Sequence, residues 1–207
     1  MKIIAITQRV EIDQSYKERR DSIDQKWIEF LTLMGFLPLL IPNSIDYVNQ
    51  NLNFLNIDGI IFTGGNSLAS YGGNAPERDQ VEKILLKWAI GKQIPVLGVC
   101  RGMQVIQEYF DNKLEKINEH VAKRHKLIVF DGYLLSELIK KFDDVNSYHE
   151  LGTSKVTGEL NLVVKSEDGV VMAIEHKNHP IYGVMWHSER EIPFKKLDMQ
   201  IFQKIFK

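Results

Sequence analysis

The 207-residue chain has only one cysteine, Cys100. A single thiol can neither form a disulfide within the chain nor supply a four-cysteine metal site, so we expect a free thiol in a reducing compartment. The six histidines show no H-E-x-x-H pattern. The sequence therefore does not favour a metal enzyme, and we expect neither a metal nor another cofactor.

The chain also lacks a charge excess and a long apolar segment. Lys and Arg together number 26 and Asp and Glu 27, which gives a formal charge of −1 and predicts no broad attraction to nucleic acid or to a membrane surface. No apolar stretch approaches the roughly 20 residues of a membrane span. Residues 1–10 lack the basic and apolar regions of a signal peptide. We expect a cytoplasmic protein with no nucleic-acid or membrane partner.

Linkers, repeats and low-complexity tracts are absent as well, so residues 1–207 are expected to form one domain. In the N-terminal half, short apolar runs alternate with helical patterns. The predicted strands are 2–7, 36–42, 58–62 and 94–100, and the predicted helices are 15–35, 44–56, 77–93 and 101–112. This alternation favours a mostly parallel sheet with helices on both faces, because crossover helices lie over the strands that they connect.

The C-terminal half has a different pattern. Its strand-like runs are 113–118, 126–130, 160–169, 170–176 and 180–187, with turn signals at EDG and KNHP. Residues 134–142 and 193–207 are predicted to be helices. The expected fold is therefore α/β, with antiparallel additions to a parallel sheet.

Cys100 lies between an apolar strand pattern and an amphipathic helix pattern, flanked by Gly98 and Gly102. The order strand, glycine, cysteine, glycine, helix has the form of a nucleophile elbow, in which a tight turn lifts the side chain above the sheet. The helix N-terminus would stabilise the thiolate. The alternative is a free cysteine that serves as a buried apolar residue. The context favours the nucleophile.

A thiol nucleophile needs a base, and of the six histidines only His187 has suitable company. It ends a strand-like run, and Glu189 follows two residues later, a spacing that points both side chains the same way in an extended chain. The carboxylate can then orient the ring while the other nitrogen faces the thiol. The alternative is an exposed histidine beside a solvated glutamate.

The segment TGGN, residues 63–66, follows another predicted strand. Consecutive glycines allow backbone N–H groups to approach a ligand closely. The amide of Gly65 and that of Arg101, which follows the nucleophile, are candidates for an oxyanion hole. A flexible strand-to-helix turn is the equal alternative.

Together these residues resemble the class I glutamine amidotransferases and their γ-glutamyl hydrolase relatives along nearly the whole chain. The elbow GVCRGMQ and the TGG loop are the most specific matches, and HSE matches the family's histidine, proline, glutamate signature except at Ser188. The resemblance implies a flavodoxin-like three-layer fold. It also implies that Cys100 attacks a γ-glutamyl amide, giving a glutamyl thioester that water, activated by His187, hydrolyses to glutamate.

The resemblance further implies where the glutamyl head group binds. Gln104 matches a family residue that contacts this group, and VNSYHE, residues 145–150, resembles a segment that helps to hold it. The substrate contacts expected in that segment are Asn146, Ser147, Tyr148 and His149. Glu150, Met185 and Ser188 depart from the family pattern, which puts head-group recognition and the local loop shape in question.

The opening AITQR and the Arg-rich stretch after it resemble the γ-glutamyl hydrolase branch. One part of that branch acts on substrates that carry nucleotide phosphates, in capsule phosphoramidate synthesis, and a charged leaving portion of this kind would need cations. The candidates are Arg9, Lys17, Arg19 and Arg20, of which we single out Arg19 and Arg20 as substrate contacts. The alternative is a solvated, charged helix start.

The expected partner is therefore a small γ-glutamyl compound, nucleotide-linked or not. Three alternatives stay open: a glutaminase subunit that delivers ammonia to a separate synthase, a γ-glutamyl-γ-aminobutyrate hydrolase, and a binding or regulatory module without activity. The sequence also leaves open the oligomeric state, including a homodimer.

Overall fold

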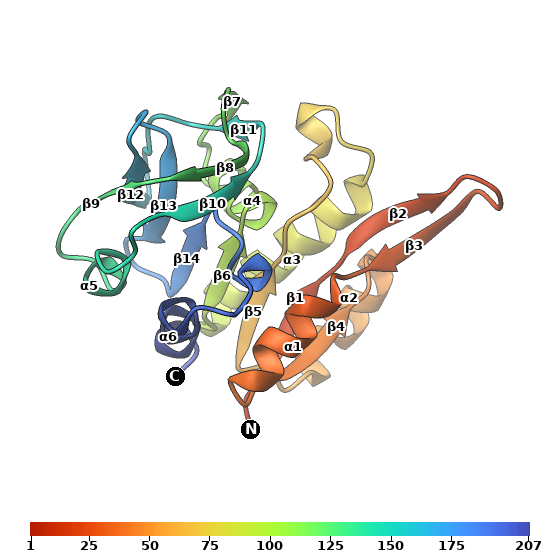
Figure 1. The fold of residues 1–207 in the computed structure, drawn as a ribbon. Coiled ribbons are helices and arrows are strands. Elements are labelled where there is room, and N and C mark those ends of the chain that lie inside the picture. The colour runs from red at the N-terminus through yellow and green to blue at the C-terminus, as the bar shows by residue number, and fades with distance from the viewer.

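The computed structural model describes residues 1–207, and its centre is an eight-stranded sheet (Figure 1). In spatial order the strands are β4 (Leu37–Ile41), β1 (Ile3–Thr7), β5 (Gly59–Phe62), β6 (Val96–Val99), β14 (Ile181–Val184), β13 (Val171–His176), β12 (Leu160–Ser166) and β9 (Leu127–Val129). The five strands from β4 to β14 run parallel, and the last three pair antiparallel. The mostly parallel α/β sheet with antiparallel additions is confirmed.

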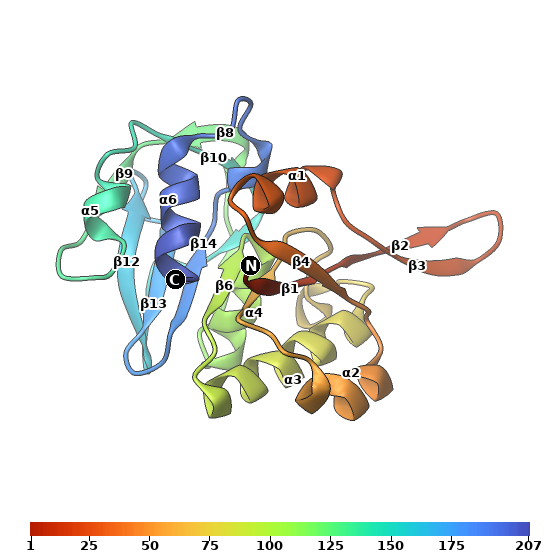
Figure 2. The same ribbon diagram turned by 90° about the horizontal axis from the view of Figure 1, so that it is seen from below.

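Helices cover both faces of this sheet (Figure 2). One face carries α1 (Gln25–Leu33) and α6 (Lys196–Ile205), which pack through the edge-to-face rings of Phe30 and Phe202 at 4.9 Å. The other face carries α2 (Ile45–Asn51), α3 (Pro76–Lys92) and α4 (Arg101–Tyr109). Strands β5 and β6 are buried along their whole length, as expected for strands covered on both sides.

Short elements complete the chain. They are α5 (Ser136–Ile139) and the single-turn helices η1 (Leu52–Phe54), η2 (Ala69–Tyr71) and η3 (Ser188–Arg190). Three two-stranded antiparallel sheets join β8 (Val121–His125) to β10 (Val145–Tyr148), β7 (Glu115–Lys116) to β11 (Leu151–Gly152), and β2 (Arg9–Asp13) to β3 (Glu18–Ser22). None of the helices combines the length and the apolar character that a membrane span requires.

The predicted helix over residues 15–35 is wrong at its start. The β2–β3 hairpin occupies residues 9–22 and projects from the body of the molecule (Figure 1). The helix begins only after Asp24, whose side chain accepts a hydrogen bond from the Lys26 N–H as an N-cap. Its predicted end is confirmed, because Gly35 has a φ of +80° and its N–H donates to the Thr32 carbonyl. Charged residues on both faces of the hairpin hid its strand periodicity.

Candidate active site

Cys100 occupies the turn between β6 and α4, at the carboxyl end of the central parallel strands. Its backbone has a φ of +53°, which is strained for a residue with a side chain. The Cys100 N–H donates to the Val184 carbonyl at 2.8 Å, and the Gln104 N–H donates to the Cys100 carbonyl at 3.1 Å. The turn therefore joins two neighbouring strands to the helix and has the strained backbone that an elbow requires.

The two flanking glycines allow α4 to approach the sheet. A Cβ on Gly102 would lie 2.1 Å from the Phe62 carbonyl oxygen, and one on Gly98 would lie 2.5 Å from the Gly102 backbone. Neither contact is possible for a larger residue, because backbone atoms of neighbouring elements cannot give way. The glycines thus bring the helix N-terminus, with its unpaired N–H groups, directly behind the thiol.

His187 follows β14 and lies beside the thiol. A side-chain hydrogen bond joins His187 and Cys100, although 87 positions separate them in the sequence. The other ring nitrogen, Nδ1, lies 2.6 Å from Glu189 Oε1. The side chains of His187 and Glu189 are each only 2% exposed. The structure therefore brings together the three residues Cys100, His187 and Glu189.

The electrostatics of the three residues favour a charged imidazole. Burial lowers the pKa of His187, but the Glu189 carboxylate and the Cys100 side chain both raise it, to about 9. His187 is therefore protonated at neutral pH and can donate a proton to a group that leaves next to the sulfur.

Asn146 of β10 holds the backbone of His187. Its Oδ1 accepts from the His187 N–H at 2.8 Å, and its Nδ2 donates to the His187 carbonyl at 2.8 Å and to Glu191 Oε1 at 2.9 Å. The side chain was predicted to contact substrate. In the structure its polar atoms are occupied by the segment that carries His187.

A cavity of about 510 Å³ opens over Cys100. Its lining includes Gly65 and Arg101, the two candidate oxyanion residues, together with Gln104. Arg101 is the first residue of α4, so its N–H has no partner within the helix. A Cβ on Gly64 would lie 2.6 Å from His187 Cε1, so the glycine loop also packs directly against the imidazole.

The remaining head-group candidates are divided between the cavity and its support. Tyr148 and His149 line the cavity, and Gln104 donates from Nε2 to the Leu151 carbonyl at 2.9 Å. Ser147 is buried and donates to the His120 carbonyl at 2.8 Å, away from the thiol. The structure thus assembles Gln104, Tyr148 and His149 around the cavity and places Ser147 behind them.

His149 is notable for an unpartnered nitrogen. Its Nδ1 lies 3.0 Å from the Leu151 carbonyl, which accepts only from an N–H, so Nε2 carries the lone pair. Nε2 is buried without a hydrogen-bond partner. Burial and the neighbouring His120 lower the pKa of His149 to about 3, so the ring is neutral at physiological pH. His149 therefore offers an acceptor to a donor group in the cavity.

Arg19 and Arg20 do not line this cavity. They lie on β3, where Arg19 pairs with Glu77 and donates to the Asn74 carbonyl, and Arg20 pairs with Asp13 and Glu18. The cation in the cavity lining is Lys116, which sequence reasoning did not single out.

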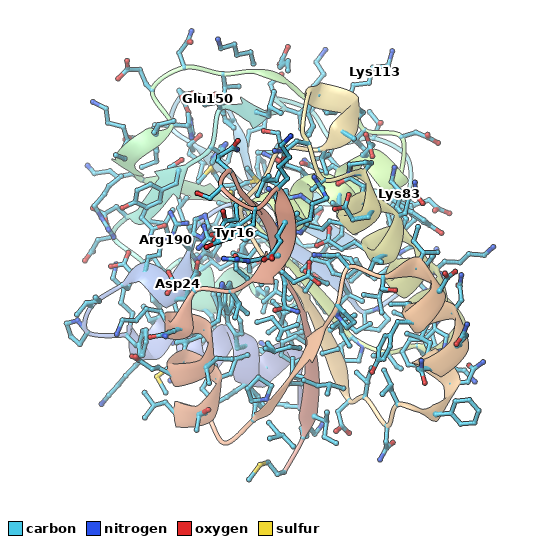
Figure 3. The ribbon with its side chains drawn as sticks, turned by 90° about the vertical axis from the view of Figure 1, so that its right-hand side faces the viewer. Tyr16, Asp24, Lys83, Lys113, Glu150 and Arg190 are labelled. Atoms are coloured by element: carbon cyan, nitrogen blue, oxygen red, sulfur yellow. The ribbon has the colours of Figure 1, made fainter.

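A second, much smaller cavity of about 20 Å³ lies on the other side of the glycine loop. Arg9, Asp24 and Arg190 line it together with His187 and Glu189. Figure 3 shows Asp24 and Arg190 beside each other behind the projecting hairpin. The Arg190 guanidinium lies 4.7 Å above the Tyr148 ring, and that ring meets His187 edge to face. Arg190 and Tyr148 thus enclose the imidazole from the solvent side.

One group of side chains has the composition of a metal site. Ligand atoms of His120, His125 and Asp168 lie within 4.8 Å of one another. The two imidazole rings, however, are stacked at 4.0 Å with an interplanar angle of 9°. An ion bound through an imidazole lies near the ring plane, and one ion cannot lie near two parallel stacked planes at bonding distance. We therefore describe these residues as a hydrogen-bonded cluster behind β10.

Comparison with solved structures defines the class of protein. The structure of a GMP synthase glutamine amidotransferase component from Thermoplasma acidophilum superposes with a TM-score of 0.74, covering 100% of this chain and 92% of that chain at 18% identity. The fold is thus that of the class I glutamine amidotransferases, with flavodoxin-like topology.

The chain belongs to the Peptidase C26 family, whose model matches residues 2–189. It is 31% identical over 194 residues to a γ-glutamyl-CDP-amidate hydrolase of Campylobacter jejuni, covering 91% of this chain and 90% of that protein. It is 28% identical over 199 residues to a γ-glutamyl-γ-aminobutyrate hydrolase of Escherichia coli O157:H7, covering 81% and 78%. Both relatives are γ-glutamyl hydrolases, which confirms the family resemblance seen in the sequence.

Proposed function

We propose that this protein is a cysteine hydrolase of γ-glutamyl amides, with Cys100 as nucleophile, His187 as acid and base, and Glu189 as the residue that orients His187. The observation that carries the proposal is the hydrogen-bonded chain from Cys100 through His187 to Glu189 at the edge of a large open cavity. Membership in a family of γ-glutamyl hydrolases and amidotransferases supports the bond type.

In the first half of the reaction, the Cys100 thiolate attacks the γ-carbonyl carbon. The carbonyl oxygen becomes an oxyanion, which accepts hydrogen bonds from the backbone N–H groups of Gly65 and Arg101. His187 then gives its proton to the amide nitrogen, the C–N bond breaks, and the amine leaves. A glutamyl thioester remains on Cys100.

In the second half, a water molecule attacks the thioester carbon while its proton passes to His187. The C–S bond breaks, glutamate leaves, and the thiolate and imidazolium are restored. Glu189 stays ionised throughout and stabilises the positive charge on His187. No cofactor enters this sequence of steps.

Recognition of the two ends of the substrate is assigned to different residues. His149 has a buried lone pair that points into the cavity, which suits the α-ammonium group of a glutamyl head, and Gln104 and Tyr148 border the same space. The leaving portion is proposed to be a nucleotide phosphoramidate, by similarity to the Campylobacter relative. Lys116, a cation in the cavity lining, is then the residue that meets the phosphates.

The test is glutamate release by the purified protein alone from three substrates: glutamine, γ-glutamyl-γ-aminobutyrate and a γ-glutamyl nucleotide phosphoramidate. We expect the nucleotide compound to have the highest kcat/KM. Cys100→Ala is expected to abolish release, and Lys113→Ala, an exposed lysine outside the cavity lining, to leave it unchanged. The kcat/KM value is also expected to fall above about pH 9, where His187 loses the proton that the leaving amine needs.

Three results would decide against parts of the proposal. Unchanged release by Cys100→Ala would refute the nucleophile. Activity that requires an added synthase would identify a glutaminase subunit instead. No release from any of the three substrates, with a slow thiol toward iodoacetamide at neutral pH, would identify a binding or regulatory module.

A further inference from the structure

Four buried charges lie behind the glycine loop and the elbow. Arg78, Asp79 and Glu82 belong to α3, and Arg101 begins α4. Arg101 pairs with both Asp79 and Glu82, and Arg78 Nε lies 3.1 Å from Glu82 Oε1. Two cations and two anions therefore neutralise one another in a site that is closed to solvent.

Arg78 directs the rest of its guanidinium at the loop. Nη1 donates to the Gly65 carbonyl at 2.7 Å, and Nη2 donates to the Thr63 carbonyl at 2.7 Å and to Thr63 Oγ1 at 3.0 Å. Nη1 also lies 3.2 Å from Asn66 Oδ1. The side chain is 0% exposed. An arginine can only donate, so these contacts occupy carbonyl groups and leave the amide N–H groups of the loop available.

The placement of these contacts has a consequence for the Gly64–Gly65 peptide. This peptide carries the candidate oxyanion N–H, and Arg78 binds the carbonyl of the peptide before it and the carbonyl of the peptide after it. Two successive glycines would otherwise give the loop many backbone conformations of similar energy. Binding on both sides removes that freedom.

Glu82 links the two halves of the oxyanion site. It accepts hydrogen bonds from Arg78, from Arg101 and from Thr7 Oγ1. The residue that orders the Gly65 loop and the residue whose own N–H forms the other half of the hole are therefore joined through one carboxylate.

We propose that Arg78 is a positioning residue, which holds the Gly65 amide in the geometry that receives the oxyanion. The inference rests on the proposed hydrolase function. Arg78 touches neither the thiol nor the cavity, and it acts by preorganising donors whose orientation decides how well they stabilise the tetrahedral intermediate.

The experiment compares two reactions of Cys100 in Arg78→Lys. Amide hydrolysis passes through an oxyanion, whereas alkylation by iodoacetamide requires only the thiolate. The lysine keeps the charge but loses the planar fork that reaches both carbonyls. We expect kcat for glutamate release to fall about 100-fold, with KM within about threefold of wild type, and the alkylation rate to change less than about twofold.

Thr63→Val provides a milder second variant, because it removes only one acceptor of Arg78. It is expected to lower kcat about tenfold, again without changing alkylation, and it decides the question if Arg78→Lys does not fold. An unchanged kcat in whichever variants fold would overturn the inference, as would a parallel fall in kcat and alkylation. If the wild type releases no glutamate, the proposed function fails and the inference with it; an active wild type with an unaffected Arg78 variant defeats the inference alone.

Discussion

Cys100 and His187 reach the same site from two regions that are built differently. On the thiol side, backbone geometry does the work: a positive φ at Cys100, glycines that admit α4, and a loop fixed by Arg78. On the base side, the backbone of His187 is held by neutral side-chain hydrogen bonds from Asn146, in a segment 41 positions earlier. The comparison indicates that close packing fixes the nucleophile, whereas a few replaceable hydrogen bonds fix the base.

The strongest test of the thiol side is Gly102→Ala. Alanine normally favours a helix interior, but here its Cβ would meet the Phe62 carbonyl oxygen at 2.1 Å, so α4 has to move away from β5. We expect a loss of about 4 kcal/mol in the free energy of unfolding, measured by urea denaturation, together with the loss of activity.

The matched control is Gly91→Ala in α3, where a Cβ would meet nothing within 4 Å. This change is expected to stabilise the protein by about 0.5–1 kcal/mol. If both variants shift stability alike, packing at Gly102 is not what fixes the elbow.

On the base side, Asn146→Ala removes both hydrogen bonds to the His187 backbone and the one to Glu191. We expect kcat to fall about 100-fold, because a small displacement of the base from the thiol is costly in an oriented reaction. The thiol side should remain in place. Near-ultraviolet circular dichroism and stability are the accompanying measurements, with the exposed Asn178→Ala as control. Full activity of Asn146→Ala would mean that the Glu189 contact alone is sufficient to place the ring.

The same difference explains which parts of the molecule the sequence predicts. The elbow is local: strand, Gly98, Cys100, Gly102 and helix lie in one run, so their joint meaning is visible in the order of residues. The contacts that hold His187 join segments far apart in the chain, and no periodicity announces them. Asn146 thus resembled a substrate contact before the structure placed it against the His187 backbone.

Two further features escaped prediction for related physical reasons. The β2–β3 hairpin has charged side chains on both faces, so the alternation that marks a half-buried strand is missing. The charges of Arg78 and Glu82 resembled those of a solvated helix, because a sequence does not distinguish a buried ion pair from an exposed i, i+4 pair. The parallel sheet was predictable because buried strands are apolar throughout.

Asp198 tests the base side through pH. The departure at Ser188 is accommodated by this residue, which accepts from Ser188 Oγ at 2.5 Å and from Trp186 Nε1 at 3.1 Å, so it contacts both neighbours of His187. Burial raises the pKa of Asp198 from 3.8 to about 6; Glu191 adds to the rise, whereas the two donors and Lys195 oppose it.

A carboxyl group that binds its proton more tightly in the folded state destabilises that state as it ionises. Ionisation of Asp198 therefore costs the wild type about 3 kcal/mol of unfolding free energy as pH rises through the range from 3.8 to about 6. Asp198→Asn does not titrate, so the stability difference between variant and wild type should shift by that amount in favour of the variant over this range. Ser188→Ala removes a donor that lowers the pKa, so its loss of stability should occur at higher pH. A difference between Asp198→Asn and wild type that is constant with pH would show that the carboxyl group is not buried as described.

The smallest expected effect lies at the boundary of the thiol side, on the β2–β3 hairpin. The Arg19–Glu77 pair is exposed to solvent, with side-chain exposures of 42% and 27%, and such pairs contribute about 0–1 kcal/mol. We expect Arg19→Ala and Arg20→Ala each to change kcat/KM less than about twofold for every γ-glutamyl substrate, in contrast to the buried Arg78. A fall of about tenfold that is confined to a nucleotide phosphoramidate would instead mean that the hairpin takes part in binding the phosphates. The thiol side would then extend beyond its buried frame.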